Sequence, residues 1–338
     1  MPAVLGTAGA GLVGGASLAT YAAAMFDLVS LAAVVAAAER IKDHIERTPV
    51  LTSSTVDMGV GAQVFFKCEN FQKVGAFKAR GAVNTVLSLS EKEAAGGVVT
   101  HSSGNHGQAL AYAASIRGIS ATVVVPDDAP APKVEAMRGY GAEIVLCPHA
   151  EREQTAQKVL AETGGVLVHP FDDRRIIAGQ GTAALELVEE VPDLDVVVTP
   201  VGGGGLMSGT AAVVRGTLGD GPRLIGAEPL AADDAFRSLA TGELQPAVSD
   251  PKTLGDGLRT GLSELTFAHL RNLGVEVVTL EEEPMRQAAI FHLERMKLVV
   301  EPSAAIALAA VRQLAGELAG KRVGVIVSGG NTDFSWLS

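Results

Sequence analysis

The stretch Val196-Val-Val-Thr-Pro-Val-Gly-Gly-Gly-Gly205 decides the fold of this chain. It predicts a Val-rich strand, then a glycine segment, then a helix from about Leu206. A continuous Val-rich strand is typical of a parallel sheet that is covered on both faces. Backbone N–H groups of glycines that converge at a helix N-terminus suit an anion such as a phosphate.

A dinucleotide site is the alternative interpretation of these glycines. Another expected strand, residues 223–227, ends at Glu228, where a ribose-binding acid would stand. The dinucleotide spacing would need a glycine at position 208, which is Ser208, so we favour the phosphate cradle. The cradle residues are Gly202, Gly203, Gly204 and Gly205.

Outward from this stretch, expected strands and helices alternate along the chain, which predicts an α/β fold with parallel sheet between helices. The expected helices are 30–45, 78–89, 108–117, 133–140, 152–162, 182–188 and 207–215. The expected strands are 64–67, 98–100, 121–125, 143–146, 166–168, 196–200, 223–227 and 323–327.

Length and composition set further limits. The chain has 338 residues, enough for one large domain or two, and a net charge of −11, which argues against nucleic acid or an anionic membrane as a partner. Cys68 and Cys147 are isolated in apolar surroundings, as expected of free thiols in a reduced, cytoplasmic protein. Residues 1–24 carry no charge and lack the basic region of a secretory signal, so we expect a disordered or non-native extension there.

Lys78 is the candidate for the central chemistry. It follows Gly75-Ala-Phe77 and precedes Ala79, so its stem is expected to lie against apolar groups. Desolvation disfavours the ammonium form and leaves a nucleophilic amine, which can form a Schiff base with an aldehyde cofactor. An exposed helix lysine is the ordinary alternative, and on this segment alone it would be preferred.

Four segments together favour the Schiff-base lysine over an exposed one. They are the lysine segment 69–82, then 102–108, 202–205 and 328–331. In this order they resemble the fold-type II pyridoxal-phosphate enzymes, in the branch of serine racemase, serine/threonine dehydratase and threo-3-hydroxyaspartate ammonia-lyase. The resemblance extends over about residues 48–331.

The resemblance implies a tryptophan synthase β-like architecture of two parallel-rich sheets with helices on both faces. It implies a large domain of residues 25–94 and 171–338, a small domain of residues 95–170, pyridoxal 5′-phosphate in the cleft between them, and a homodimer.

The same resemblance implies how the cofactor is held. Phe77 and Lys78 lie at it, the four glycines hold its phosphate, and Asn105 contacts its ring oxygen. Ser328 donates a hydrogen bond to the pyridine nitrogen. A neutral hydroxyl suits an unprotonated pyridine, which is a weaker electron sink and favours elimination or quick reprotonation over transamination. The ordinary alternatives are a helix cap at Asn105 and a strand-to-turn serine at 328.

For the substrate, the resemblance implies that Ser102, Asn105 and His106 help to hold the carboxylate, partly through backbone N–H groups. Ser103 corresponds to the position that faces Lys78 across the substrate Cα, which permits racemisation without requiring it. Arg152 corresponds to an arginine that meets a second carboxylate and would suit 3-hydroxyaspartate, although a solvated helix arginine is the alternative.

The segment from Glu228 to Asp234 resembles the family's divalent-cation site, in which the two carboxylates and the carbonyl of Ala232 bind the ion. Oxygen ligands suit Mg²⁺ or Ca²⁺. An exposed acidic turn is the alternative.

We therefore expect a pyridoxal-phosphate-dependent ammonia-lyase that converts serine, threonine or threo-3-hydroxyaspartate to a 2-oxo acid and ammonia through Lys78. A serine racemase that uses Lys78 and Ser103 is the alternative, alone or as a second activity of the same site. A binder of cofactor or amino acid without turnover is a more remote possibility, because a binder has no need of a base.

Overall fold

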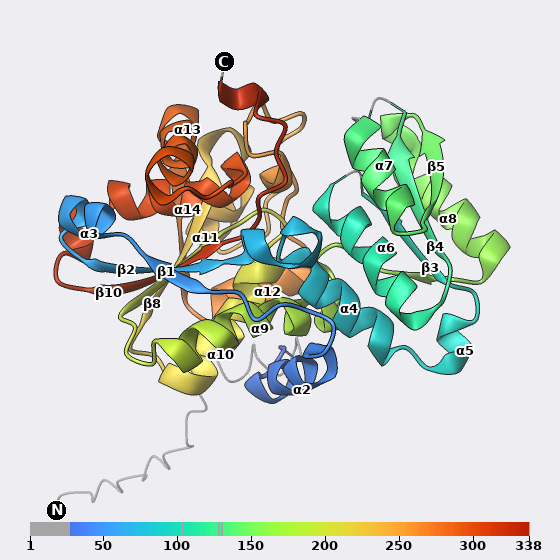
Figure 1. Ribbon diagram of the computed structural model, residues 1–338, viewed down its shortest axis with the longest axis horizontal. Helices are drawn as coiled ribbons and strands as arrows, with labels where there is room; N and C mark the ends of the chain where they lie inside the picture. The colour runs from blue at the N-terminus through green and yellow to red at the C-terminus, as the bar shows by residue number, and fades with distance from the viewer. Residues whose placement is uncertain (1–27, 103, 128, 130, 338) are drawn as a thin grey trace, which may run out of the picture.

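The computed structural model describes residues 28–102, 104–127, 129 and 131–337 (Figure 1). The expected extension at residues 1–24 and the proposed catalytic Ser103 therefore lie outside the described residues. The chain forms two sheets, and Figure 1 shows the smaller one with α6, α7 and α8 to one side of the larger one.

The larger sheet has six strands in the order β1-β2-β10-β7-β8-β9, with only β1 antiparallel to its neighbour. The smaller has four parallel strands in the order β5-β4-β3-β6. The strands are β1 (Val50–Thr52), β2 (Gln63–Cys68), β3 (Val98–His101), β4 (Ala121–Pro126), β5 (Glu143–Cys147), β6 (Val166–Leu167), β7 (Val196–Pro200), β8 (Arg223–Pro229), β9 (Val275–Leu280) and β10 (Arg322–Val327).

Helices cover both faces of the larger sheet, as the apolar strands predict. The α-helices are α2 (Leu31–Ile41), α3 (Ser54–Val60), α4 (Lys78–Ser88), α5 (Glu91–Ala94), α6 (Asn105–Arg117), α7 (Ala131–Gly139), α8 (Arg152–Thr163), α9 (Arg174–Glu190), α10 (Gly205–Leu218), α11 (Asp234–Thr241), α12 (Glu264–Asn272), α13 (Glu282–Phe291), α14 (Pro302–Gln313) and α15 (Ala315–Leu318). The short helical turns are η1 (Glu69–Phe71), η2 (Lys73–Gly75), η3 (His149–Glu151), η4 (Leu230–Ala232), η5 (Asp256–Leu258), the π-helical η6 (His292–Met296) and η7 (Ser335–Leu337).

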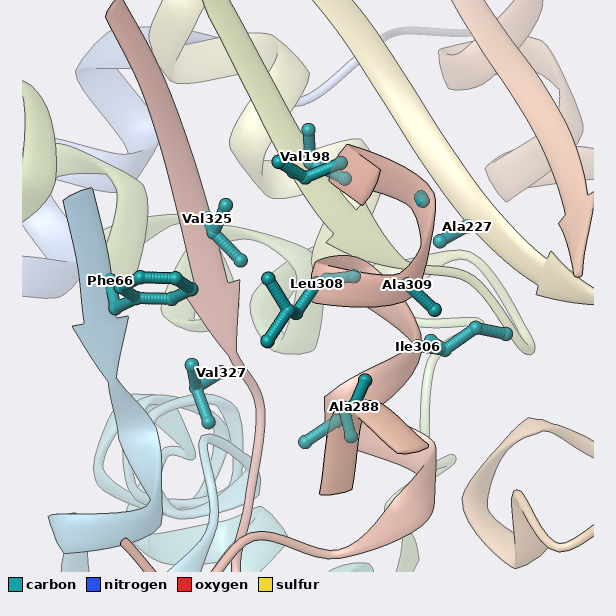
Figure 2. Close-up of a cluster of buried hydrophobic side chains, with 14 of the residues drawn as sticks. Phe66, Val198, Ala227, Ala288, Ile306, Leu308, Ala309, Val325 and Val327 are labelled. Atoms are coloured by element: carbon teal, nitrogen blue, oxygen red, sulfur yellow. The ribbon is translucent and has the colours of Figure 1, made fainter. Parts of the chain in front are cut away.

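The core on one face of the larger sheet lies between the strands and α14. Leu308 of α14 points toward Phe66 of β2 and Val325 of β10 (Figure 2). A second core on the opposite face joins the sheet to α2, α9 and α10. Because Phe, Tyr and Trp make up only 4% of the chain, both cores consist mainly of Ala, Val, Leu and Ile.

The expected α/β alternation is confirmed, with differences at helix starts. Helix α6 begins at Asn105 rather than near Gln108, so Asn105 and His106 lie in its first turn and not in the preceding loop. Helix α9 begins at Arg174, eight residues before the expected start, because the side chain of Asp173 accepts a hydrogen bond from the N–H of Arg175 and caps it.

All the segments with candidate functional residues follow the carboxyl ends of parallel strands. The lysine segment follows β2, the asparagine segment β3, the glycines β7 and the serine segment β10. Ligands of open α/β sheets bind at this edge, where neighbouring loops diverge. In the described part of the chain, no helix combines the length and the apolar character needed to cross a membrane.

Candidate active site

The lysine and serine segments are joined through their backbones. Strands β2 and β10 pair in parallel with Val327 opposite Cys68, so the segments that follow them leave the sheet side by side. The N–H of Phe77 donates to the carbonyl of Ser328 over 3.0 Å, and Ala76 forms an isolated bridge with Gly329. Lys78 therefore begins its helix at a fixed place beside Ser328.

The Lys78 amine lies in a partly buried position at the N-terminus of α4. Its Nζ donates to the carbonyl of Pro170 over 2.9 Å and lies 5.0 Å from the centre of the Phe77 ring. Burial lowers the pKa of Lys78 to about 8, although the charge of Glu301 acts in the opposite direction. At pH 7 roughly a tenth of this amine is consequently uncharged, far more than for an ordinary lysine.

The glycine segment and Lys78 both contact the segment Pro170-Phe171. Gly204 has a φ of +82°, which favours glycine, and a Cβ added at Gly203 would come within 2.1 Å of the Phe171 ring. Phe171 follows Pro170, the hydrogen-bond partner of Lys78. One two-residue segment thus brings the lysine and the glycines to the same edge of the sheet.

Asn105 joins the smaller sheet to the larger one. Its Oδ1 accepts from Nδ2 of Asn331 over 2.9 Å, and its Nδ2 donates to the two carboxylate oxygens of Glu301 over 3.0 and 3.2 Å. Asn331 also donates to the carbonyl of Val74, just before the lysine. Three of the four sequence segments therefore meet at the Asn331 amide, which bonds both Val74 and Asn105.

Glu301 is a residue that the sequence interpretation missed. It precedes Pro302 as the N-cap of α14, which is an ordinary place for an acid, but its side chain makes no cap hydrogen bond and is buried against Gly329 and Asn105. Burial, and next the charge of Asp256, raise the pKa of Glu301 to about 8. The only sequence signal was an acid next to the apolar pair Val299-Val300.

Three histidines lie close to this edge. Nε2 of His106 lies 2.9 Å from the carbonyl of Val168, which can only accept, so the ring donates there. Burial lowers the pKa of His106 to about 3, and the neutral ring then offers only the lone pair of Nδ1, a buried atom without a partner in the described chain. His106 can therefore donate to a substrate carboxylate only through its backbone. His101 and His169 stack edge to face at 6.0 Å.

Two other predicted substrate residues lie at the edge of this arrangement. Oγ of Ser102 accepts from the N–H of Gly104 over 3.3 Å, which shapes the turn into α6. Arg152 starts α8, and its Nε donates to the carbonyl of His149 over 3.1 Å. Burial lowers the pKa of His101; the charge of Glu153 opposes this effect, and the nearby charge of Arg152 adds to it. No hydrogen bond in the described residues joins Arg152 to the Lys78 segment.

The predicted metal residues lie at the end of β8. The two carboxylate oxygens of Glu228 accept from the N–H groups of Ala235 and Phe236 over 2.9 Å, and Oδ2 of Asp234 accepts from the N–H of Leu262 over 3.0 Å. Burial raises the pKa of Glu228 to about 8 and also raises that of Asp234. Neither carboxylate has a salt bridge within the described chain.

A cation would therefore relieve two neighbouring buried acids, and the residues present fit one in this respect. The described residues contain no cluster of three or more His, Cys, Asp or Glu side chains that could hold a metal ion. A site here would depend on two carboxylates, the carbonyl of Ala232 and water.

Comparison with known proteins agrees with this arrangement. Residues 41–329 match the model of the pyridoxal-phosphate dependent enzyme family. The chain is 49% identical to β-hydroxyaspartate dehydratase of Paracoccus denitrificans, covering 90% of this chain and 96% of the relative. It is 45% identical to L-threo-3-hydroxyaspartate ammonia-lyase of Saccharomyces cerevisiae, covering 89% and 92%.

Among solved structures, that of serine racemase from Dictyostelium discoideum superposes with a TM-score of 0.86 at 46% identity, covering 90% of this chain and 99% of that one. The chain thus belongs to the pyridoxal-phosphate-dependent enzymes. The family resemblance inferred from the four sequence segments is confirmed.

Proposed function

We propose that this protein is a pyridoxal-phosphate-dependent ammonia-lyase that converts a β-hydroxy amino acid to a 2-oxo acid and ammonia. The single observation that carries the proposal is the Lys78 amine. Its pKa is lowered to about 8, and it is held at Pro170, directly before the Phe171 ring that contacts the glycine segment. A binder of amino acids has no need of such a base.

The residues present fit pyridoxal phosphate. The backbone of Gly202–Gly205 at the start of α10 suits the phosphate, Ser328 suits the pyridine nitrogen, and Asn105 the ring oxygen, with Phe77 beside Lys78. When bound, the cofactor supplies an electron sink for the negative charge that develops at the substrate Cα.

The chain's own groups supply proton transfer and orientation. We assign to the uncharged form of Lys78 removal of the proton from the substrate Cα, since a base must be deprotonated to act. Ser328 is neutral, so it does not hold a proton on the ring nitrogen as an aspartate would. The N–H groups at the start of α6, with Ser102 and Asn105, suit the substrate carboxylate.

The candidate substrates are serine, threonine and threo-3-hydroxyaspartate. The relatives from P. denitrificans and S. cerevisiae are named for hydroxyaspartate, which favours the diacid. Arg152 is the candidate for the second carboxylate. Because its Nε is already bonded to His149, binding would use the terminal nitrogens of the guanidinium.

Serine racemase is the second candidate function, supported by the likeness to the D. discoideum enzyme and by Ser103. A hydroxyl opposite Lys78 would give both faces of the Cα an acid or base. Replacement of Ser103 by alanine is expected to remove interconversion of D- and L-serine while sparing deamination of the L-substrate. Equal loss of both activities would contradict this role.

Three further features are part of the proposal. Mg²⁺ or Ca²⁺ at Glu228, Ala232 and Asp234 is supported by the two buried acids. A homodimer rests on the family resemblance. A cytoplasmic location rests on Cys68 and Cys147, which are buried and unpaired. We also propose that the chain is divided into a small domain, residues 95–170, and a large domain, residues 25–94 and 171–338.

The test is 2-oxo-acid release from L-threo-3-hydroxyaspartate, L-serine, D-serine and L-threonine, with serine enantiomers followed by chiral chromatography. Replacement of Lys78 by alanine should abolish the visible absorbance of the Schiff base with the cofactor and reduce the rate by roughly 10²–10⁴-fold, the usual contribution of a proton-transfer group. Lys73→Ala is the matched control, because Lys73 pairs with Glu46 in a partly exposed position. A Lys78→Ala variant with intact activity would refute the assignment.

A further inference from the structure

A cluster of buried charges joins α4 to β2 and α9, and the proposed reaction does not use it. At its centre Arg80, with no exposed surface, makes four charged hydrogen bonds. Its Nε and Nη2 donate to Glu69 over 2.7 and 2.8 Å. Its Nη1 and Nη2 donate to Glu186 over 2.7 and 2.9 Å. Both acids are therefore held by two bonds each, the most directional geometry that a guanidinium offers.

The remaining polar groups of the cluster are also satisfied. Nη1 of Arg80 donates to Oγ1 of Thr182 over 3.1 Å. Lys67, fully buried on β2, pairs with Glu186 and donates to the carbonyl of Thr48 over 2.6 Å. Oγ1 of Thr48 donates to Glu69. Two positive and two negative side chains thus balance. Because buried ion pairs stabilise folds only weakly in comparison with apolar packing, a geometric role needs to be considered.

The position of Arg80 in the chain suggests that role. Arg80 is two residues after Lys78, and its N–H donates to the carbonyl of Phe77 over 3.0 Å. On the other side of the lysine, the N–H of Phe77 is bonded to Ser328. The backbone of Lys78 therefore lies between two fixed points, while its side chain makes one hydrogen bond within the described residues, to Pro170.

Helix α9 connects this cluster to the glycine segment. Glu186 and Thr182 lie on α9, which contacts α4 so closely that a Cβ at Gly179 would come within 2.5 Å of Cα of Gly81. The same helix contacts α10, where a Cβ at Gly209 would come within 2.5 Å of the backbone of Gly181. Helix α10 begins at Gly205, so α9 is the common support of the lysine and the glycines.

We propose that Arg80, held between Glu69 and Glu186, is a positioning residue that sets the place of Lys78 relative to Gly202–Gly205. The separation between the amine and the glycine segment is then fixed before the cofactor enters. The inference rests on the proposed role of Lys78, and goes beyond it by assigning the geometry to a cluster that touches neither substrate nor cofactor.

The test compares Arg80→Lys with Leu318→Ala. Lysine keeps the charge of Arg80 but cannot make two bonds to each of two acids. Leu318 is equally buried on α15, just before the amino end of β10, and so at the opposite edge of the sheet from Ser328. Its truncation is expected to lower the melting temperature by leaving a cavity in the core. The readouts on the cofactor-loaded proteins are melting temperature, the fraction of pyridoxal phosphate that borohydride attaches to Lys78, and kcat and KM for L-threo-3-hydroxyaspartate. Amide exchange along α4 is measured on the protein without cofactor.

Arg80→Lys is expected to lower the attached fraction and to reduce kcat by roughly 10–100-fold with KM nearly unchanged, since small misplacements of reacting groups cost this much. The α4 amides should exchange faster. Leu318→Ala should leave the attached fraction and kcat unchanged. Glu186→Gln keeps the shape of the side chain that Arg80 binds, and it should lower kcat and the attached fraction less than Arg80→Lys does. It replaces Arg80→Lys as the test if that variant does not fold.

Equal kcat and equal attachment in Arg80→Lys and Leu318→Ala would overturn the proposal and leave the cluster a folding role only. An unchanged Glu186→Gln variant would count against it in the same way. Failure of the proposed function has a different signature, because then borohydride would not attach the cofactor to Lys78 even in the unmodified protein.

Discussion

At the scale of single residues, Lys78 and Glu301 depend on each other. Both are poorly hydrated, and burial moves the pKa of each to about 8, downward for the ammonium and upward for the carboxyl. The Glu301 carboxylate favours the charged form of Lys78, so the acid limits how far the lysine pKa can fall. Asn105 bonds the same carboxylate, which couples this charge to the residue proposed to contact the cofactor ring.

Replacement of Glu301 by glutamine is therefore expected to lower the pKa of Lys78 further, because desolvation remains and the neighbouring negative charge is lost. The measurement is the pH dependence of Lys78 labelling by an amine-reactive reagent in the protein without cofactor, followed by mass spectrometry. Glu294→Gln, an exposed site on η6, is the control. A midpoint that stays in place or moves upward would show that the two groups do not interact.

The difference in how well these two residues could be predicted has a physical reason. Lys78 could be identified because its neighbours in the sequence are apolar and because three further segments of the same family accompany it, although its hydrogen-bond partner Pro170 is 92 residues away. Glu301 acquires its environment from Asn105, 196 residues away, and from Gly329 across the sheet edge. Ordinary sequence patterns do not contain such a contact, so the acid is interpreted as a helix cap.

At the scale of elements, the turn from β8 into α11 contains two acids that folding buries. The unfolded chain releases the proton of Glu228 near its ordinary value of 4.5, whereas the folded chain keeps it until about 8. Between these values the folded state binds more protons, so this group lowers stability progressively as the pH rises from about 4.5 to about 8. A divalent cation favours the ionised form and would reverse the loss.

We therefore expect Mg²⁺ or Ca²⁺ to raise the melting temperature, and EDTA to lower it, more at about pH 8 than at about pH 5.5. At 100 times its dissociation constant a ligand adds about 2.7 kcal/mol, which is roughly a few degrees for a chain of this size. Glu228→Gln should remove both the metal response and this part of the pH dependence, while the exposed Glu243→Gln should keep them. A melting temperature that neither cation nor EDTA changes at pH 8 would rule out the cation site.

Strand–helix alternation was predictable at this scale because apolar periodicity is local, but helix starts were less so. Helix α6 begins after Gly104, which has no side chain for a cap. The expected start lies near Gln108 because the Ser/Asn-rich segment before it is typical of a loop with a helix cap, whereas Asn105 is already helical. The first turn of α6 is nevertheless what points its N–H groups toward the candidate site.

At the scale of the whole molecule, the two sheets meet around the candidate site, and a few side chains join them. Besides Asn105, Lys133 of α7 pairs with Oδ2 of Asp256 in η5 over 2.7 Å. Oδ1 of Asp256 accepts from Ser303 over 3.2 Å. The neighbouring Gly257 lies close to Gly202: a Cβ added at Gly202 would come within 3.0 Å of the carbonyl oxygen of Gly257. The ion pair thus connects the smaller sheet's helices to the loop that supports the glycines.

Because Lys133 and Asp256 are both partly exposed, their pair is worth at most about 1 kcal/mol. Loss of the pair should therefore favour a more open arrangement of the two sheets by no more than roughly fivefold. We expect Lys133→Ala to raise KM for L-threo-3-hydroxyaspartate by up to that factor, with kcat nearly unchanged. Asp256→Asn should have the same effect, and the double variant should add little to either, since both remove one interaction.

Arg138→Ala provides the control for this last prediction. Arg138 lies on the same helix and pairs with Glu135 within it, so its loss removes a surface ion pair without touching the connection between the sheets. Raising the salt concentration should weaken substrate binding in the unmodified protein and have less effect in Lys133→Ala, because an exposed pair is screened. Additive effects of Lys133→Ala and Asp256→Asn on KM would show that the two residues act separately, and that the sheets are held together by Asn105 and the apolar contacts instead.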